Sequence, residues 1–288
     1  MKLLRKNKLY IAYAFCIIFV IGLLAVVEDT SHENVLTKEK EQLVASSTVV
    51  NLNPMVEKAE EEPAPLYQYI KVTDSCGTAY DGVCVNVRSK PSTEASAVFK
   101  ARNGMVLKVK GKVEGEEREW YRITFDEWLR YPERVTGEMY IAADFVTPFV
   151  DEGNVEITKL TKKTDKRIIV DRSEQKLYAY EGEELFMEEA ASTGLDTTPT
   201  PRGTFTVFKK RPSRYMQGPI PEISQKSYDL PGVPWNLYFT EQGAIIHGAY
   251  WHEHFGEQWS NGCVNLPMDK AEKLYRWADV GTRVIVRD

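Results

Sequence analysis

The sequence predicts a mainly β protein that has a membrane helix at its N-terminus, two β-rich domains and one further helix near its C-terminus. Three features carry this prediction. A basic segment precedes residues 9–27, which carry no charge; short runs of alternating apolar and polar residues follow from residue 66; and residues 267–278 have the apolar spacing of a helix. The 288 residues suit two globular domains with accessory segments, and a net charge of −5 without a basic stripe argues against a nucleic-acid-binding protein.

Residues 1–29 are predicted to be a short cytoplasmic tip followed by a membrane anchor. At about 1.5 Å per residue, the uncharged residues 9–27 span roughly 28 Å, close to the ~30 Å hydrocarbon thickness of a bilayer. The basic residues before them stay in the cytoplasm, so the rest of the chain lies on the outer side of the membrane. A cleaved signal peptide is the alternative, although its apolar region is normally shorter and ends in a small-residue cleavage site.

Residues 30–65 are predicted to be a linker. Charged residues, Ser and Pro dominate this stretch and its apolar residues keep no sustained period, which is typical of a disordered segment. A coil of this length spans roughly 30–36 Å and could let a membrane-held domain work above the bilayer. A stalk without a special role is the other interpretation.

Residues 66–150 are predicted to form a small β-barrel. VCVNVRS and three later runs alternate apolar and polar residues, with turn residues between them. The tripeptide NVR at residues 86–88, followed by Pro91, resembles the opening of a bacterial SH3-like domain. The insertion DEWLRYPERVT, residues 126–136, is longer than that family usually has, so the resemblance assigns no ligand contacts to it.

The cysteines separate into three kinds. Cys16 lies within the predicted membrane span, where it acts as a small apolar residue. Cys76 and Cys84 are natural disulfide partners in an oxidising compartment, and a pair of buried, reduced thiols is the alternative. If the disulfide forms, Cys263 is the one thiol left over outside the membrane.

Residues 166–288 are predicted to form a second β-rich domain. Short apolar runs separated by turns predict its strands, from RIIV at the start to RVIV at the end. Residues 267–278 predict one helix directly after Cys263. Pro267 suits the first turn of this helix, and Gly281 follows its end.

Cys263 has the surroundings that a nucleophilic cysteine needs. Such a cysteine requires a partner to ionise its thiol and donors for the oxyanion that forms on attack. His247 ends an apolar strand sixteen residues before the cysteine, and Gly262 permits a sharp turn just before it. This turn would let the amides of Gly262 and Cys263 face a substrate oxygen.

The stretch HGAYWHEHFGEQWSNGCVNL, residues 247–266, resembles the active-site signature of the L,D-transpeptidase (YkuD) family. The segments VDRSEQKLYAY, STG and TPRGTFTV resemble that family's opening strands, so the likeness covers about residues 166–286. It implies that Cys263 is the nucleophile, that His247 is its base and that the Gly248 carbonyl orients the imidazole. It also implies that residues around the cysteine support the turn and the oxyanion. These residues are Ser260, Asn261, Gly262 and Asn265. Many members of the family carry a second histidine at the position of Asn261.

The resemblance further implies a reaction on peptidoglycan in a bacterial cell envelope. The cysteine would attack the third residue of a tetrapeptide stem, expel D-Ala, and pass the acyl group to an amine, which forms a 3→3 crosslink, or to water. No cofactor is implied, and carbapenem-type β-lactams are the implied inhibitors. Several large side chains are candidates to line the substrate cleft. These are Arg202, Arg214, Tyr228, Trp235, Tyr238 and Trp251.

Three alternatives stay open. Free cysteine is often buried, so Cys263 could be a small core residue. A zinc site could use His247, His252, His254 and Cys263, although their spacing matches no closed zinc site. The chain could also bind the cell wall without turnover, with the SH3-like domain holding glycan or stem peptide.

Overall fold

Strands dominate the described part of the chain, as the sequence predicts; a computed structural model describes residues 65–115, 117–221 and 225–288. The predicted membrane segment, residues 9–27, and nearly all of the predicted linker lie outside these residues. Within the described ranges, no helix is long and apolar enough to cross a membrane.

The first seven strands form one sheet with the order β3-β2-β6-β5-β4-β1-β7, and every neighbouring pair in it is antiparallel. In β2, for example, two buried valines alternate with partly exposed polar residues, as expected for a strand with one face on a core. The strands are β1 (Tyr67–Val72), β2 (Val85–Arg88), β3 (Ala97–Ala101), β4 (Val106–Glu114), β5 (Glu119–Thr124), β6 (Met139–Ala142) and β7 (Val146–Asp151). Two 3₁₀ turns, Pro132–Arg134 and Ala143–Phe145, flank β6.

A disulfide joins Cys76 to Cys84, with a Cα–Cα distance of 4.4 Å. The loop that it closes delays the start of β2 until Val85, whereas the alternating pattern predicts a strand from Val83. Val83 is therefore 89% exposed, while Val87 in the same run of valines is fully buried.

Removal of this disulfide is expected to destabilise the protein. Closing a loop of about nine residues restricts the unfolded chain and should contribute about 2.5 kcal/mol to the free energy of unfolding. The variant Cys76→Ser/Cys84→Ser should therefore unfold at a lower urea concentration than the wild type. A reductant should shift the wild-type midpoint by a similar amount and leave that of the variant unchanged. Equal midpoints for the two proteins would contradict the expectation.

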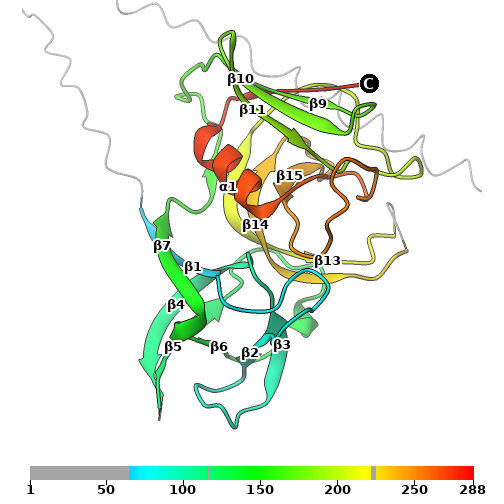
Figure 1. Cartoon of the computed structure of the whole chain (residues 1–288). Helices are drawn as coiled ribbons and strands as arrows, with labels where there is room; N and C mark the ends of the chain where they lie inside the picture. The colour runs from blue at the N-terminus through cyan, green and yellow to red at the C-terminus, as the bar shows by residue number, and fades with distance from the viewer. Residues whose placement is uncertain (1–64, 116, 222–224) are drawn as a thin grey trace, which may run out of the picture. The chain divides into compact units, whose positions relative to one another are not determined.

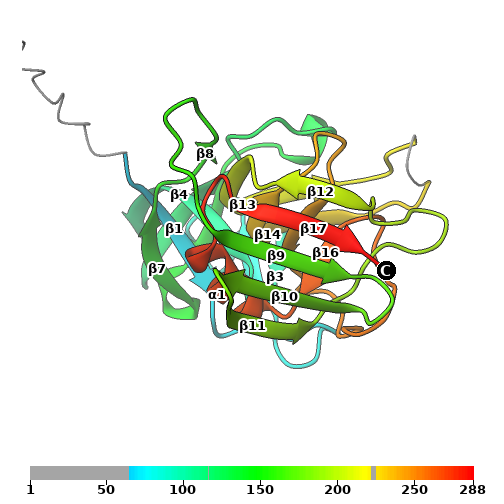
Figure 2. The ribbon, with the colours of Figure 1, turned by 90° about the horizontal axis from the view of Figure 1, so that it is seen from above.

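The C-terminal region contains two five-stranded sheets, with the orders β11-β10-β9-β17-β12 and β16-β15-β14-β13-β8. Figure 2 shows the first of these sheets from above, with the C-terminal strand β17 between β9 and β12. The first sheet comprises β9 (Lys166–Asp171), β10 (Lys176–Glu181), β11 (Glu184–Ala190), β12 (Gly203–Thr206) and β17 (Arg283–Arg287). The second comprises β8 (Val155–Glu156), β13 (Lys209–Gln217), β14 (Asp229–Tyr238), β15 (Ile245–Gly248) and β16 (Val264–Leu266).

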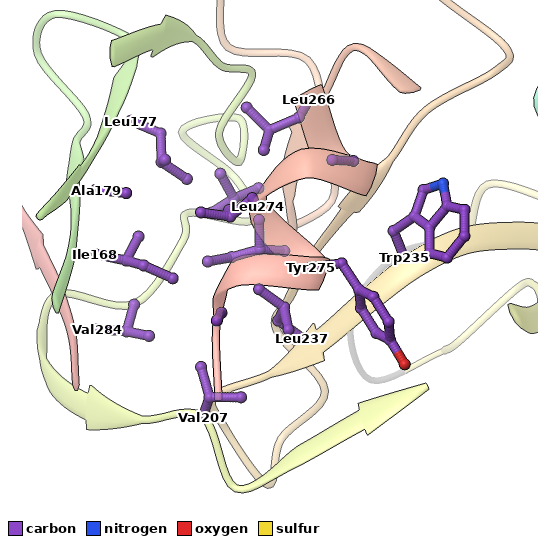
Figure 3. Close-up of a cluster of buried hydrophobic side chains, with 14 of the residues drawn as sticks. Ile168, Leu177, Ala179, Val207, Trp235, Leu237, Leu266, Leu274, Tyr275 and Val284 are labelled. Carbon is purple, nitrogen blue, oxygen red and sulfur yellow. The ribbon is translucent and has the colours of Figure 1, made fainter. Parts of the chain in front are cut away.

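The predicted helix is α1, Met268–Trp277, which lies beside β14 and β15 (Figure 1). Its buried residues Ala271, Leu274 and Tyr275 follow the spacing of one helix face. These side chains pack between the two sheets, and Figure 3 shows Leu274 among the aliphatic side chains of both. The helix therefore fixes the position of β16, which ends two residues before it.

The N-terminal sheet packs directly on the second C-terminal sheet. Val106 of β4 and Trp235 of β14 belong to the same buried cluster, and the Ser213 hydroxyl on β13 donates a hydrogen bond to the Val106 carbonyl at 2.5 Å. Lys71 on β1 forms a 2.9 Å ion pair with Glu272 on α1. These contacts bring the N-terminal sheet against the strand pair β13–β14 that also borders the site described below.

Candidate active site

The parallel pairing of β15 with β16 brings the predicted nucleophile and the predicted base together. In this register His247 lies opposite Asn265, and Cys263 directly precedes β16. The Ile245 amide lies near the Cys263 sulfur, which extends the same register by one residue. Because side chains alternate along a strand, Cys263 and Asn265 face the same side as His247.

The turn before Cys263 is held by side-chain hydrogen bonds to the backbone. Gly262 has a φ of 111°, a conformation that favours glycine. The Ser260 hydroxyl accepts a hydrogen bond from the Gly262 amide at 3.1 Å and donates one to the Cys263 carbonyl at 2.6 Å. Ser260 thus supports the turn as the resemblance implies, but the Gly262 amide is engaged inside the turn and does not face a substrate oxygen.

A second loop, residues 192–200, forms backbone hydrogen bonds with the residues on either side of Cys263. Ser192 pairs with Asn265 through two backbone hydrogen bonds, of 3.0 and 2.8 Å. Gly194 pairs with Ser260, and a Cβ atom at Gly194 would lie 2.2 Å from a carbonyl oxygen of the same loop and 2.9 Å from the Gly262 Cα. Only glycine allows the loop and the turn to approach so closely. The STG segment, residues 192–194, therefore supports the turn that precedes Cys263.

A chain of hydrogen bonds fixes the protonation pattern of two imidazoles. The His254 amide donates to His252 Nδ1 at 3.1 Å, so the proton of the neutral His252 ring is on Nε2, which lies 2.9 Å from Asn265 Oδ1. Asn265 Nδ2 then donates to His247 Nε2 at 3.0 Å, and His247 Nδ1–H donates to the Gly248 carbonyl at 3.0 Å. The proton of His247 is therefore on Nδ1, its Nε2 lone pair accepts the hydrogen bond from Asn265, and the Gly248 carbonyl orients the ring as the resemblance implies.

Asn265 has a different role from the one that the sequence indicates. Its side chain lies between the rings of His247 and His252 instead of supporting the turn. The second imidazole near this asparagine is that of His252, and Asn261 lines the cavity described below. His254 is exposed, and its ring stacks on Trp259 with a centroid distance of 3.7 Å.

Cys263 and His247 line one cavity of about 260 Å³. Among the described residues, no hydrogen bond joins the Cys263 sulfur to the His247 ring; the sulfur lies 3.9 Å from the Gly243 carbonyl oxygen. Other side chains predicted for the site also line the cavity. These are Arg214, Tyr228, Trp251, Ser260, Asn261 and Asn265.

Three predicted cleft residues lie elsewhere. Arg202 pairs with Asp288 near the C-terminus, because β12 places it beside β17 and away from the cysteine. Trp235 is buried in the core on β14. Tyr238 does not line the cavity and lies under the Arg214 guanidinium, whose carbon is 5.4 Å from the centre of the tyrosine ring.

Comparison with known proteins identifies both regions of the chain. Residues 165–286 match the family model of the L,D-transpeptidase catalytic domain, and residues 81–146 match that of the bacterial SH3 domain. The C-terminal region is an L,D-transpeptidase catalytic domain of the YkuD family.

Two relatives carry the same family name. A Mycobacterium tuberculosis protein named "Probable L,D-transpeptidase 3" is 35% identical over 103 residues, which are 34% of this chain and 38% of that protein. YqjB of Bacillus subtilis, which is also named as an L,D-transpeptidase, is 32% identical over 105 residues, which are 34% of this chain and 58% of the relative. The similarity thus spans less than two thirds of either relative.

Solved structures with detectable similarity include two transpeptidases. An L,D-transpeptidase from Mycobacterium smegmatis has 21% identity and a TM-score of 0.41, with 78% of this chain and 100% of that chain covered. The catalytic domain of an L,D-transpeptidase from E. faecium has 26% identity and a TM-score of 0.38, with 44% and 100% covered.

The two candidate reacting groups of this transpeptidase domain are both uncharged at neutral pH. Burial lowers the pKa of His247 to about 4, so its imidazole is uncharged at neutral pH. Burial raises the pKa of the half-buried Cys263 thiol, although the Ile245 amide and the Arg214 guanidinium act in the opposite direction. The site therefore holds a thiol beside a neutral base, with no preformed thiolate–imidazolium pair.

The alkylation rate of Cys263 should report this neutral state. Iodoacetamide reacts with the thiolate, so its rate follows the ionised fraction of the thiol. Because the pKa of Cys263 is raised, we expect the rate to increase with pH through pH 9 without levelling near neutrality. Intact mass measured after timed quenching gives this rate. A plateau below pH 8 would indicate a thiolate–imidazolium pair instead.

The zinc alternative has no geometric support in the transpeptidase domain. Across residues 65–115, 117–221 and 225–288, no three His, Cys, Asp or Glu side chains are grouped so that they could hold a metal ion. His247 Nε2 and His252 Nε2 both contact Asn265, so the asparagine amide occupies the space between the two rings.

Among the lining residues that sequence reasoning missed, two come from outside the catalytic domain. Trp128 and Arg130 come from the insertion between β5 and β6, on the SH3-like region. The unusual length of this insertion was the available signal, but nothing local in the sequence shows which surface it reaches.

Proposed function

We propose that this chain is a peptidoglycan L,D-transpeptidase that forms 3→3 crosslinks through a thioester on Cys263. One observation carries the proposal: Cys263 and the uncharged His247 line the same cavity, and hydrogen bonds fix the His247 tautomer that can accept a proton at Nε2. A protein that only binds the cell wall needs neither a thiol nor a base in its cleft.

In the first step, the Cys263 sulfur attacks the carbonyl carbon of the third residue of a tetrapeptide stem. The thiol proton moves to His247 Nε2, in place of the hydrogen bond from Asn265. The tetrahedral intermediate collapses to the thioester as the bond to D-Ala breaks. His247 returns its proton to the departing amine, so D-Ala leaves as the free amino acid.

In the second step, an amine of a neighbouring stem attacks the thioester carbon. His247 Nε2 takes a proton from this amine and gives it to the sulfur, so a peptide bond forms and the Cys263 thiol is restored. Water in place of the amine would give a tripeptide, which is the product of a carboxypeptidase. The catalytic groups serve both reactions, and only the attacking molecule differs.

We propose that the enzyme is held at the outer side of the cytoplasmic membrane. Residues 9–27, with the basic residues before them, would hold the chain in the cytoplasmic membrane and place the catalytic domain on the outer side, where peptidoglycan lies. The Cys76–Cys84 disulfide supports this proposal, since disulfides persist in oxidising compartments.

Product analysis tests the proposal. The full-length chain is incubated with disaccharide tetrapeptide, and the products are separated and identified by mass. Crosslinked dimers together with released D-Ala support transfer, whereas tripeptide without dimers indicates a carboxypeptidase. Binding of the muropeptide without release of D-Ala would overturn the enzymatic function and favour a cell-wall-binding protein.

A further inference from the structure

The insertion between β5 and β6, residues 126–136, is bound to the catalytic domain along β13. The Tyr215 amide donates a hydrogen bond to the Glu127 carboxylate at 2.7 Å. The Tyr131 amide donates to the Gln217 side-chain carbonyl at 2.9 Å, and the Gln217 side-chain amide donates back to the Tyr131 carbonyl at 3.1 Å. Arg134 donates to the Gly218 carbonyl at 3.0 Å. The insertion is thus bonded to the catalytic domain at three successive points.

The contact between the Glu127 carboxylate and the Tyr215 amide is buried. Only 7% of the Glu127 side chain is exposed, and its second oxygen lies 3.3 Å from the Arg211 guanidinium. Burial raises the pKa of this carboxyl group, while Arg211 and the Tyr215 amide act in the opposite direction. A buried carboxylate that loses its guanidinium and its backbone donor is left uncompensated, which is strongly unfavourable, so this end of the insertion is held firmly.

Between Glu127 and Tyr131, two side chains reach the cavity of Cys263. Trp128 and Arg130 both line it, and both are exposed to solvent. The Arg130 guanidinium lies 5.7 Å from the centre of the Trp128 ring, within the range of a cation–π contact. Because residues on both sides are fixed to β13, these side chains are held at the wall of the cleft.

The positive charge of the cavity wall favours binding of an anion. Among the described residues that line the cavity, the charged side chains are Arg130, Arg214 and Lys226, and none is a carboxylate. Tyr228 lies within the electrostatic reach of both arginines and of the cysteine. Burial is the main cause that raises the pKa of its hydroxyl, and Cys263 raises this pKa further. Arg214 and Arg130 act in the opposite direction and lower it. The two guanidinium groups thus act on the cleft from the catalytic domain and from the SH3-like region.

We propose that the SH3-like region completes the donor site, and that Arg130 binds a carboxylate of the stem peptide. This inference rests on the proposed function, because a tetrapeptide stem is the substrate that places carboxylates next to the carbonyl under attack. Guanidinium groups suit this task, since they bind carboxylates through two parallel hydrogen bonds. Arg130 is therefore a specificity-determining residue that lies outside the catalytic domain.

The test measures release of D-Ala by the full-length chain from three versions of disaccharide tetrapeptide. One version has free carboxylates, one is amidated at the C-terminal D-Ala, and one is amidated at the carboxylate within the stem. Arg130→Ala should raise the KM for the free version about tenfold or more and leave kcat within about twofold, since a hydrogen bond to a charged group is lost. The effect of Arg130→Ala should vanish on the one version in which the carboxylate that Arg130 binds is amidated. Arg130→Lys should restore part of the affinity for the free version.

The matched control is Arg283→Ala, which removes an exposed arginine on β17 that does not line the cavity. A KM change below about twofold for Arg130→Ala, the same change on all three versions, or an equal change in the control would each overturn the inference. If the wild type releases no D-Ala, the proposed function fails instead. The inference is then judged by the Kd of the free muropeptide for Cys263→Ala, with and without Arg130→Ala, where equal values overturn it.

Discussion

Cys263→Ala is expected to abolish both D-Ala release and the formation of a carbapenem adduct. The sulfur forms the thioester in the proposed mechanism, and no other group can take its place, so turnover should fall by at least about 10³-fold. A carbapenem added to the wild type should increase its mass by one molecule of drug, and peptide mapping should place the adduct on Cys263. The variant should show no increase in mass.

The other cysteines provide the controls. Cys76 and Cys84 are joined in a disulfide, and Cys263 is the free cysteine among the described residues. Cys16 lies in the predicted membrane segment, so Cys16→Ala should keep both the adduct and the turnover. Urea unfolding should confirm that Cys263→Ala remains folded. An undiminished adduct on Cys263→Ala would show that the nucleophile lies elsewhere.

Local patterns were sufficient to predict the elements that build the catalytic domain. The helix predicted at residues 267–278 is α1, Met268–Trp277, because its buried residues are spaced as one helix face and a proline directly precedes it. The strand that carries His247 and the turn that carries Cys263 were predicted for similar reasons. Apolar periodicity and glycine placement act over a few residues, so they can be recognised in the sequence alone.

Contacts between distant segments could not be predicted in this way. Asn265 lies between His247 and His252 because β15 and β16 pair in parallel with a specific register, and no local pattern sets this register. Trp128 and Arg130 reach the cavity because residues on either side of them bond to β13, more than eighty positions further along the chain. The sequence showed an insertion of unusual length and gave no sign of its partner.

His247→Ala is expected to lower kcat/KM by about 10²- to 10⁴-fold at neutral pH, the usual contribution of a general base. The reason is specific to this site. Because burial raises the pKa of the Cys263 thiol, few molecules carry a thiolate at neutral pH, and the sulfur depends on a base that takes its proton during attack. With the pKa of His247 lowered to about 4, the wild-type imidazole is already available as a base at pH 5 and above.

The pH dependence of this loss distinguishes a base from a structural residue. As the pH rises toward and beyond the thiol pKa, the thiolate forms without help, so the ratio of wild-type to variant activity should shrink steadily. His254→Ala is the matched control, because this exposed histidine stacks on Trp259 and does not line the cavity; it should stay within about twofold of the wild type. A loss in His247→Ala that is the same at every pH between 6 and 10 would mean that the ring holds the cleft in shape without accepting the thiol proton.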